Sequence, residues 1–327
     1  MHMIETRLIT TAAQAAALLE TGGLVALPTE TVYGLGARAD NAVAIARVFK
    51  AKGRPADNPL IAHVATMDQV DQLVHATPAY AKSLMERFWP GPLTLVLPAR
   101  EGVPSLLTAG LQTVAVRMPD HPLARAVIER VGVPVAAPSA NRSGRPSPTT
   151  WEAVRDDLNG RIDGILVAEP TTVGLESTVI DCTGPAPVIL RPGAITLADL
   201  QSVHQGSRMR TAQDAVHRSP GLRHRHYRPD AEVRWVGPNG SFTPDAGFMV
   251  RSTSGPAAYI GLHPPPDPSG YFRIEIVPSL EVYARSLFHF FRTCESEGIR
   301  VIDCERVPCD GLGQALIDRI DRAAGSK

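Results

Sequence analysis

The chain has 327 residues, of which 44% are hydrophobic and 20% are charged, and its formal net charge is zero. This length suits two domains, and this composition is typical of a folded globular protein with substantial cores. A neutral chain has no overall field that would attract nucleic acid or a membrane, so any anion-binding site must be local.

The N-terminus and the cysteines bear on location. The first residues, MHMIETRLITTAAQ, carry an early Glu5 and no apolar core, and the chain has no run of 18 apolar residues. We therefore predict neither a signal peptide nor a membrane span. The four cysteines form no C-x-x-C pair, and their spacing suits neither a zinc site nor a disulfide framework. These features favour a cytoplasmic protein.

The first motif joins a strand to a polar loop. The apolar run at residues 24–27 predicts a buried strand, which Pro28 ends. Polar side chains follow in the sequence PTETVY. Gly34 and Gly36 are then expected to form a turn with positive φ, where a ligand can approach the backbone.

A helix is expected after this loop. Asp40 or Asn41 can cap it, and its apolar positions are compatible with one buried stripe. The helix leads into a basic segment that includes Lys52 and Arg54. The strand, the glycine loop, the helix and the basic loop together predict a pocket for a small anionic ligand.

Strands and helices continue to alternate up to residue 203. Strands are predicted at residues 4–10, 59–64, 93–97, 113–118, 133–137, 165–167, 178–181 and 188–190. Helices are predicted at residues 11–20, 67–75, 78–88, 121–131, 151–158 and 196–203.

Polar side chains lie near the ends of several of these strands. Two interpretations of His63 are open, namely ligand binding or a half-buried histidine at a strand edge. Two are open for Arg117 as well, namely ligand binding or a solvated arginine at a strand end. The loop at residues 138–147 carries hydroxyls, amides and two arginines, which suit phosphate binding or, equally, an ordinary surface turn. Ser177 does not lie in a G-x-S-x-G motif, so no nucleophilic serine is predicted.

The pattern changes after residue 204. Residues 205–218 lack apolar periodicity and are predicted to be a linker, and the basic segment at residues 218–228 taken alone suits a solvated linker. The remainder is predicted to form a second, smaller α/β domain with a parallel sheet. Its elements are strands at residues 233–236, 247–250, 258–262, 274–277 and 299–302 and helices at residues 280–297 and 313–324.

An ordered series of motifs makes the sequence recognisable. The motifs are PTETVYGLG (28–36), KGRP (52–55), NPLIAHV (58–64), WPGPLTLVL (89–97), TVAVRMPDHP (113–122), APSANRSGRPSPT (137–149), GLESTVID (174–181), ILRPGAI (189–195) and SPGLRHRHYRP (219–229). The series resembles the YrdC-like family of L-threonylcarbamoyladenylate synthases, in its longer two-domain form. No single motif is specific, but their order over roughly the first 230 residues is.

The resemblance implies the fold and the domain boundaries. Residues 1–204 would form an α/β domain with a YrdC-like twisted mixed sheet and helices. Residues 205–230 would be a linker that closes over the active site as a lid. Residues 231–327 would form a smaller Rossmann-like α/β domain.

The resemblance also implies the reaction, a nucleotidyl transfer. L-threonine, bicarbonate and ATP would yield L-threonylcarbamoyl-AMP and pyrophosphate, for threonylcarbamoylation of adenosine in transfer RNA. Mg²⁺ would arrive with ATP and be held chiefly by phosphate oxygens and water, so no protein ligand to a metal is named. A tRNA threonylcarbamoyl transferase complex would act downstream.

The family's site residues map onto this chain by the motifs alone. Catalytic roles would belong to Lys52 and Arg54. The threonine-binding residues would be Thr31, His63, Arg117, Ala137 and Ser177. The nucleotide-binding residues would be Arg54, Asn58, Thr113, Ser139, Asn141, Ser147, Arg191 and His224. Longer relatives often carry an aromatic residue where this chain has His224, so that contact departs from the family pattern.

Two other functions remain open on the sequence. Gly34-x-Gly36-x-x-Ala39 with Asp57 weakly resembles a dinucleotide fingerprint, although PTETVY separates the strand from the first glycine. A concave basic surface without catalysis would instead hold RNA. That surface would comprise Lys50, Lys52, Arg54, Arg117, Arg142, Arg145 and Arg191. The aromatic content of 5% argues against it, because single-strand binders stack bases on aromatic side chains.

Overall fold

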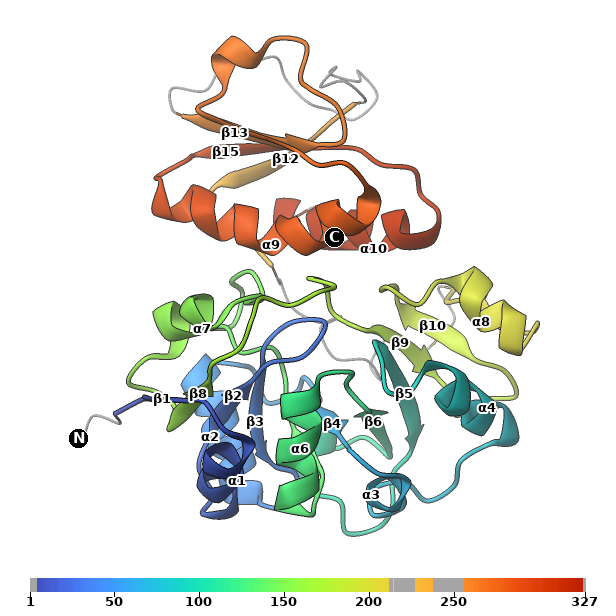
Figure 1. Cartoon of the computed structure of the whole chain (residues 1–327). Helices are drawn as coiled ribbons and strands as arrows, with labels where there is room; N and C mark the ends of the chain where they lie inside the picture. Colours follow the sequence, from blue (N-terminus) through green and yellow to red (C-terminus); the bar gives the residue numbers. More distant parts are fainter. Residues whose placement is uncertain (1–4, 212–213, 215–226, 238–255, 326–327) are drawn as a thin grey trace.

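The computed structural model describes residues 5–211, 214, 227–237 and 256–325, which form two domains (Figure 1). The larger domain contains an 11-stranded sheet and the smaller domain a four-stranded sheet. Helices pack against both sheets, so the predicted α/β class is confirmed. No described helix combines the length and the apolar character that crossing a bilayer requires.

The larger sheet is mixed, as predicted. Its order is β1-β8-β2-β3-β7-β4-β6-β5-β9-β10-β11, and it contains both parallel and antiparallel pairs. Its strands are β1 (Arg7–Ile9), β2 (Val25–Leu27), β3 (Gly34–Arg38), β4 (Ile61–His63), β5 (Leu93–Pro98), β6 (Thr113–Arg117), β7 (Val135–Ala136), β8 (Gly164–Leu166), β9 (Thr178–Asp181), β10 (Val188–Arg191) and β11 (Arg208–Met209).

Local capping sets several helix boundaries in this domain. The helices are α1 (Ala12–Glu20), α2 (Ala42–Lys52), α3 (Met67–Asp71), α4 (Ala79–Phe88), α5 (Ser105–Thr108), α6 (Pro122–Val131), α7 (Trp151–Leu158) and α8 (Leu197–Val203). Thr11 forms a capping box with Gln14 at the start of α1, and the Asn41 side chain accepts the backbone N–H of Ala44 at the start of α2. Helix α2 ends at Lys52 and is capped by Gly53, whose φ of 62° suits glycine.

The prediction of a glycine turn after PTETVY is wrong. Gly34 and Gly36 lie in β3, which pairs antiparallel with β2, and neither has a positive φ. They are glycines because neighbours are close: a Cβ at Gly34 would lie 3.1 Å from the Ala137 Cβ, and one at Gly36 would lie 3.0 Å from the Val25 carbonyl oxygen. This placement also removes the dinucleotide alternative, which needs a glycine turn leading into a helix.

Two further elements lie outside the sequence prediction. Helix α5 was not predicted, and β11 forms inside the range predicted as a linker, where it pairs in parallel with β10. The larger sheet therefore extends past residue 204. The other predicted elements of this domain are present, with bounds that differ by a few residues.

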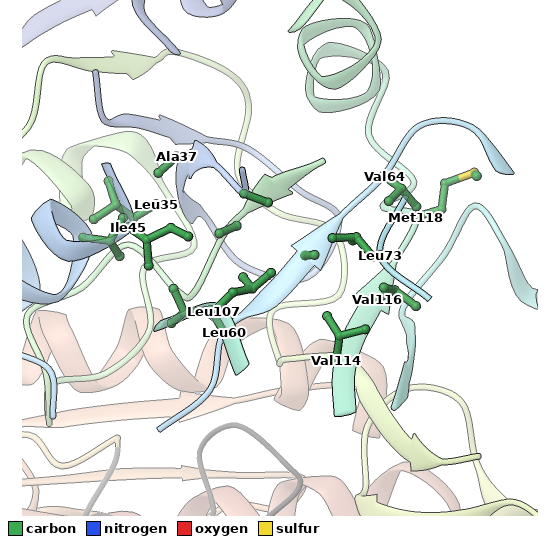
Figure 2. Close-up of a cluster of buried hydrophobic side chains, with 14 of the residues drawn as sticks. Leu35, Ala37, Ile45, Leu60, Val64, Leu73, Leu107, Val114, Val116 and Met118 are labelled. Carbon is green, nitrogen blue, oxygen red and sulfur yellow. The ribbon is translucent and has the colours of Figure 1, made fainter. Parts of the chain in front are cut away.

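The main core of the larger domain lies between the sheet and its helices (Figure 2). Leu35 of β3 and Val114 and Val116 of β6 contribute, together with Ile45 of α2. Each is at most 1% exposed, and complete burial of such a side chain contributes about 1.5–3 kcal/mol. This core fixes the strands whose ends carry the polar residues described below.

The smaller sheet is entirely parallel in its described pairs, as predicted. Its order is β12-β15-β13-β14, with strands β12 (Glu232–Val236), β13 (Ala257–Gly261), β14 (Arg273–Ile276) and β15 (Val301–Glu305). The helices are α9 (Leu280–Ser296) and α10 (Gly311–Ala324), and the 3₁₀ turn η4 (Pro268–Gly270) lies before β14. Figure 1 shows α9 and α10 between this sheet and the larger domain. The strand predicted at residues 247–250 lies outside the described residues.

The four cysteines are free thiols in this structure. Cys182, Cys294 and Cys304 are buried, and burial raises the pKa of each thiol. Cys309 is exposed and precedes α10.

Candidate active site

A cavity that opens to solvent is lined by most of the residues that the sequence assigned to the site. The predicted residues that line it are Thr31, Arg54, His63, Arg117, Ala137, Ser139, Asn141, Ser177 and Arg191. They come from seven separate motifs, which the fold brings together.

One end of the cavity is built around Arg117, at the end of β6. Its Nη1 donates to the Thr31 hydroxyl (2.8 Å) and its Nε donates to the Gly91 carbonyl (3.2 Å). Its Nη2 forms an ion pair with Glu30 Oε1 at 2.6 Å, and the two side chains are only 4% and 8% exposed. A buried guanidinium in this position suits the recognition of a carboxylate.

His63 lies beside Arg117 because β4 and β6 pair in parallel. The ring is 4% exposed, and its buried Nδ1 has no hydrogen-bond partner among the described residues. Burial, reinforced by the charge of Arg117, lowers the pKa of His63 to about 3. His63 is therefore neutral at pH 7 and offers the cavity a polar group without charge.

The loop after β7 supplies the polar groups of the S-x-N motif. Ser139 Oγ donates to Asn141 Oδ1 (2.5 Å), and Asn141 Nδ2 donates to the carbonyls of Arg142 and Arg145 (2.8 Å each). Lys52 Nζ donates to the carbonyls of Ser139 and Asn141. The loop is thus held by its own side chains and by the buried amino group of Lys52.

Lys52 does not line the cavity. It is 3% exposed, and burial lowers its pKa well below the ordinary lysine value. Its contacts position the S-x-N loop, and a direct contact with phosphate stays a prediction.

Arg54 lines the cavity, whereas two residues predicted beside it do not. Arg54 donates to the carbonyls of Asn58 (3.4 Å) and Pro59 (3.1 Å), and burial lowers its pKa to about 10, which leaves it charged at neutral pH. Asn58 is fully buried behind it. Thr113 is the first residue of β6, at the opposite end of that strand from Arg117.

A third group lies at the start of β9. Ser177 Oγ lies 2.8 Å from the Thr94 hydroxyl, and the Ser177 carbonyl accepts a hydrogen bond from Arg191 Nη2 (3.0 Å). Both Ser177 and Arg191 are buried, and burial lowers the pKa of Arg191. Ser147 lies behind this group, where its hydroxyl donates to Glu176 Oε1 (2.5 Å).

The described end of the predicted lid reaches the cavity. Tyr227 lines it and is 5% exposed. Its φ of 68° is unusual for a residue other than glycine, a conformation that persists only where surrounding contacts hold it. His224, the remaining predicted nucleotide ligand, lies outside the described residues.

Sequence reasoning missed several residues at this site. Thr29, Glu176 and Tyr227 line the cavity, and Glu30 pairs with Arg117. Glu30 lies inside the PTET motif, and Glu176 directly precedes Ser177, so their positions next to predicted residues were the available indication.

The basic-surface alternative is not supported by the burial of its residues. Lys52, Arg117 and Arg191 are 3–4% exposed and are engaged in internal hydrogen bonds. They therefore do not form an open surface for RNA. Nor do the described residues contain a group of three or more His, Cys, Asp or Glu side chains suited to a metal.

Comparisons with known proteins bear on the identity of the chain. A family model described as "Telomere recombination" matches residues 17–193, and one described as "Threonylcarbamoyl-AMP synthase, C-terminal domain" matches residues 195–325. The threonylcarbamoyl-AMP synthase of Bacillus subtilis is 42% identical, over 96% of this chain and 93% of that protein. That of Pyrococcus abyssi is 43% identical, over 95% and 93%.

The chain belongs to the threonylcarbamoyl-AMP synthase family. The crystal structure of P. abyssi Sua5 complexed with L-threonine matches with a TM-score of 0.86 and 39% identity. The match covers 99% of this chain and 98% of that one, so the two-domain arrangement extends over both proteins. The predicted family and its two-domain type are thereby confirmed.

Members of the threonylcarbamoyl-AMP synthase family also occur in a shorter form. A putative threonylcarbamoyl-AMP synthase of Mycobacterium tuberculosis is 38% identical over 57% of this chain, yet that alignment covers 85% of the relative. The smaller domain is therefore a feature of only some members. Its contacts with residues that line the cavity indicate what it contributes to the site in this chain.

Proposed function

We propose that this chain is an L-threonylcarbamoyl-AMP synthase that uses L-threonine, bicarbonate and ATP and releases pyrophosphate. The observation that carries the proposal is one cavity that is lined by a buried Arg117 beside a neutral His63, together with Arg54, Arg191 and the S-x-N loop. Full-length relatives named threonylcarbamoyl-AMP synthase support the same reaction.

The proposed chemistry has two steps. The threonine amine and bicarbonate form a carbamate with loss of water, and a carbamate oxygen then displaces pyrophosphate from the α-phosphate of ATP. Neither step needs a covalent nucleophile on the protein. The protein lowers the barrier by aligning the reactants and by neutralising phosphate charge in a site sheltered from water.

Threonine would bind at the Arg117 end. The guanidinium would hold the amino-acid carboxylate, while Thr31 and the Ala137 backbone provide further polar contacts. Because His63 is neutral at pH 7, it adds no second positive charge next to the threonine amine, which must lose its proton to react.

ATP would occupy the remainder of the cavity. Arg54 and Arg191 would face the phosphates, and Ser139 and Asn141 would donate or accept hydrogen bonds there. Mg²⁺ would enter with ATP, and we assign it no protein ligand and no step. Tyr227, near the C-terminal end of the lid, would cover the site and shelter the mixed anhydride from water.

Partners and location remain at the level of prediction. The product would pass to a tRNA threonylcarbamoyl transferase complex, and the free state of all four cysteines supports a reducing compartment such as the cytoplasm.

The test is pyrophosphate release from ATP with threonine, serine or no amino acid, each with and without bicarbonate. We expect release that requires threonine and bicarbonate, and a loss of at least tenfold in kcat/KM for Arg54→Ala and for Lys52→Ala. Lys50→Ala is the matched control, because Lys50 is exposed on the same helix. Tight RNA binding without any pyrophosphate release would overturn the proposal.

A further inference from the structure

One buried arginine of the smaller domain contacts three segments of the candidate active site. Arg319 of α10 is 0% exposed. Its Nε donates to Glu176 Oε2 (2.8 Å), and its Nη2 donates to the Glu176 carbonyl (3.3 Å). Its Nη1 donates to the Pro192 carbonyl (3.0 Å), and its guanidinium carbon lies 5.7 Å from the centre of the Tyr227 ring.

The contacts with Glu176 and Pro192 are made to sequence neighbours of predicted ligand-binding residues. Glu176 lines the cavity, directly precedes Ser177 and accepts the Ser147 hydroxyl. Pro192 directly follows Arg191. Burial alone would raise the pKa of Glu176, but the charges of Arg319 and Arg191 outweigh it and lower the pKa, so this buried carboxylate stays ionised.

Apolar packing joins the same loops to the smaller domain. Val32 and Leu175 belong to the hydrophobic core of that domain, although each lies in a motif of the larger one. Gly174, with a φ of 80°, is in close contact with α9: a Cβ there would lie 2.4 Å from the Arg285 Cα. The loop at residues 174–177 is thus enclosed by the smaller domain on one side and by the cavity on the other.

We propose that Arg319 is a positioning residue for the reaction, through which the smaller domain holds the loop at residues 174–177, and with it Ser177, in its working geometry. This inference rests on the proposed function for its catalytic consequence. A long, two-armed side chain is required, because the same guanidinium must reach both Glu176 and the Pro192 carbonyl.

The variants separate positioning from general stability. Arg319→Gln removes the charge, and Arg319→Lys keeps it but loses the fork. Arg319→Gln/Glu176→Gln removes the carboxylate that the first change leaves buried and unpaired. Leu316→Ala is the matched control, since Leu316 is fully buried in the smaller domain's core on the same helix and is placed in none of these contacts.

Two readouts on the full-length chain decide the matter. The first is kcat and KM for pyrophosphate release, at a temperature where every variant is folded. The second is hydrogen exchange of the amides at residues 174–177, which requires no activity. We expect Arg319→Gln to lower kcat at least tenfold and to speed exchange at least tenfold. Arg319→Lys should lie between it and the parent chain, and the double variant should recover part of the exchange protection.

Leu316→Ala should lower Tm and leave kcat and the exchange at residues 174–177 within twofold of the parent chain. The inference is overturned if Arg319→Gln keeps kcat, with or without faster exchange, or if Leu316→Ala reproduces both effects. Absence of threonine- and bicarbonate-dependent pyrophosphate release from the parent chain would sink the proposed function instead, and the exchange data would still report whether Arg319 fixes the loop.

Discussion

Two buried arginines of this protein have opposite hydrogen-bonding environments. Each of the three guanidinium nitrogens of Arg319 donates a hydrogen bond within the protein. Around Arg117, several polar atoms lack a hydrogen-bond partner. The described residues contain eight buried side-chain polar atoms without such a partner, and four of these atoms belong to Glu30, His63 and Arg117. The 2.6 Å contact of Glu30 with Arg117 is an ion pair by distance without the angles of a hydrogen bond.

This difference distinguishes a cluster that stabilises the fold, around Arg319, from the proposed ligand-binding site, around Arg117. Native proteins satisfy nearly all buried polar groups, so a concentration of unsatisfied atoms in a cavity marks a place where a ligand completes the network. The Arg319 cluster is complete within the protein and contributes geometry. At the Arg117 end, the described residues leave these atoms without a hydrogen-bond partner, which supports the proposal that a ligand binds there.

The largest expected effect comes from removing Arg117. Arg117→Met should lower kcat/KM for pyrophosphate release at least 100-fold and cost about 3–5 kcal/mol of folding stability, because Glu30 is left buried and unpaired. Adding Glu30→Gln should restore much of the stability but not the activity. Urea unfolding and the coupled pyrophosphate assay measure both. Recovery of activity together with stability would make Arg117 a structural arginine like Arg319.

Replacement of Lys52 tests whether losing a side chain that positions a loop has a different effect from losing one that binds a ligand. Lys52→Met removes the donor to the Ser139 and Asn141 carbonyls. We expect a tenfold or larger rise in KM for ATP, with a stability loss of about 1–3 kcal/mol because buried carbonyls lose their donor. Lys50→Met on the exposed side of α2 is the control. An unchanged KM for threonine would localise the effect to the nucleotide end, and an equal rise in both would contradict it.

His63 gives a smaller effect that depends on pH. Its native pKa of about 3 lies below the unfolded value of about 6.5, so the unfolded chain binds an extra proton between these values. The stability contributed by neutral His63 is present above pH 6.5 and falls as pH drops toward 3, by at most about 1.4 kcal/mol per pH unit. His63→Asn should remove this component. Parallel urea titrations at pH 7, 6, 5 and 4 measure it, and identical slopes for both chains would refute the assignment.

The smallest effect is expected far from both clusters. The Arg38–Asp40 ion pair is 2.7 Å long, and its side chains are 27% and 49% exposed. Asp40→Asn should change stability by less than about 1 kcal/mol and leave kcat/KM unaltered. A loss of stability greater than about 1 kcal/mol in thermal unfolding would show that this exposed ion pair contributes more than is usual for solvated pairs.

The sequence predicted much of the fold because many elements have local causes. Thr150 caps α7 and Asn41 caps α2, and the apolar run of β9 has the same bounds in the structure as in the prediction. Strand β3 was missed because two of its five residues are glycine, which normally weakens a strand. Its glycines are explained only by Ala137 and Val25, which are distant in sequence or belong to another strand.

The residues of the candidate site were predicted from the family's motifs and not from local patterns of hydrophobicity or capping. His63 and Arg117 lie together because β4 pairs with β6, a register that no local pattern specifies. Glu176 and Arg319 are 143 residues apart in the sequence, and neither a glutamate nor an arginine indicates which distant residue it will pair with. Buried ion pairs between domains therefore had to come from the structure.

The four cysteines make this chain convenient to study. Only Cys309 is exposed, while burial raises the pKa of the other three thiols and keeps them from forming the reactive thiolate. A maleimide fluorophore will therefore attach at a single place without any cysteine being replaced. That place precedes by two residues the start of α10, the helix that carries Arg319, so the native sequence already provides a spectroscopic reporter for the movement of this helix.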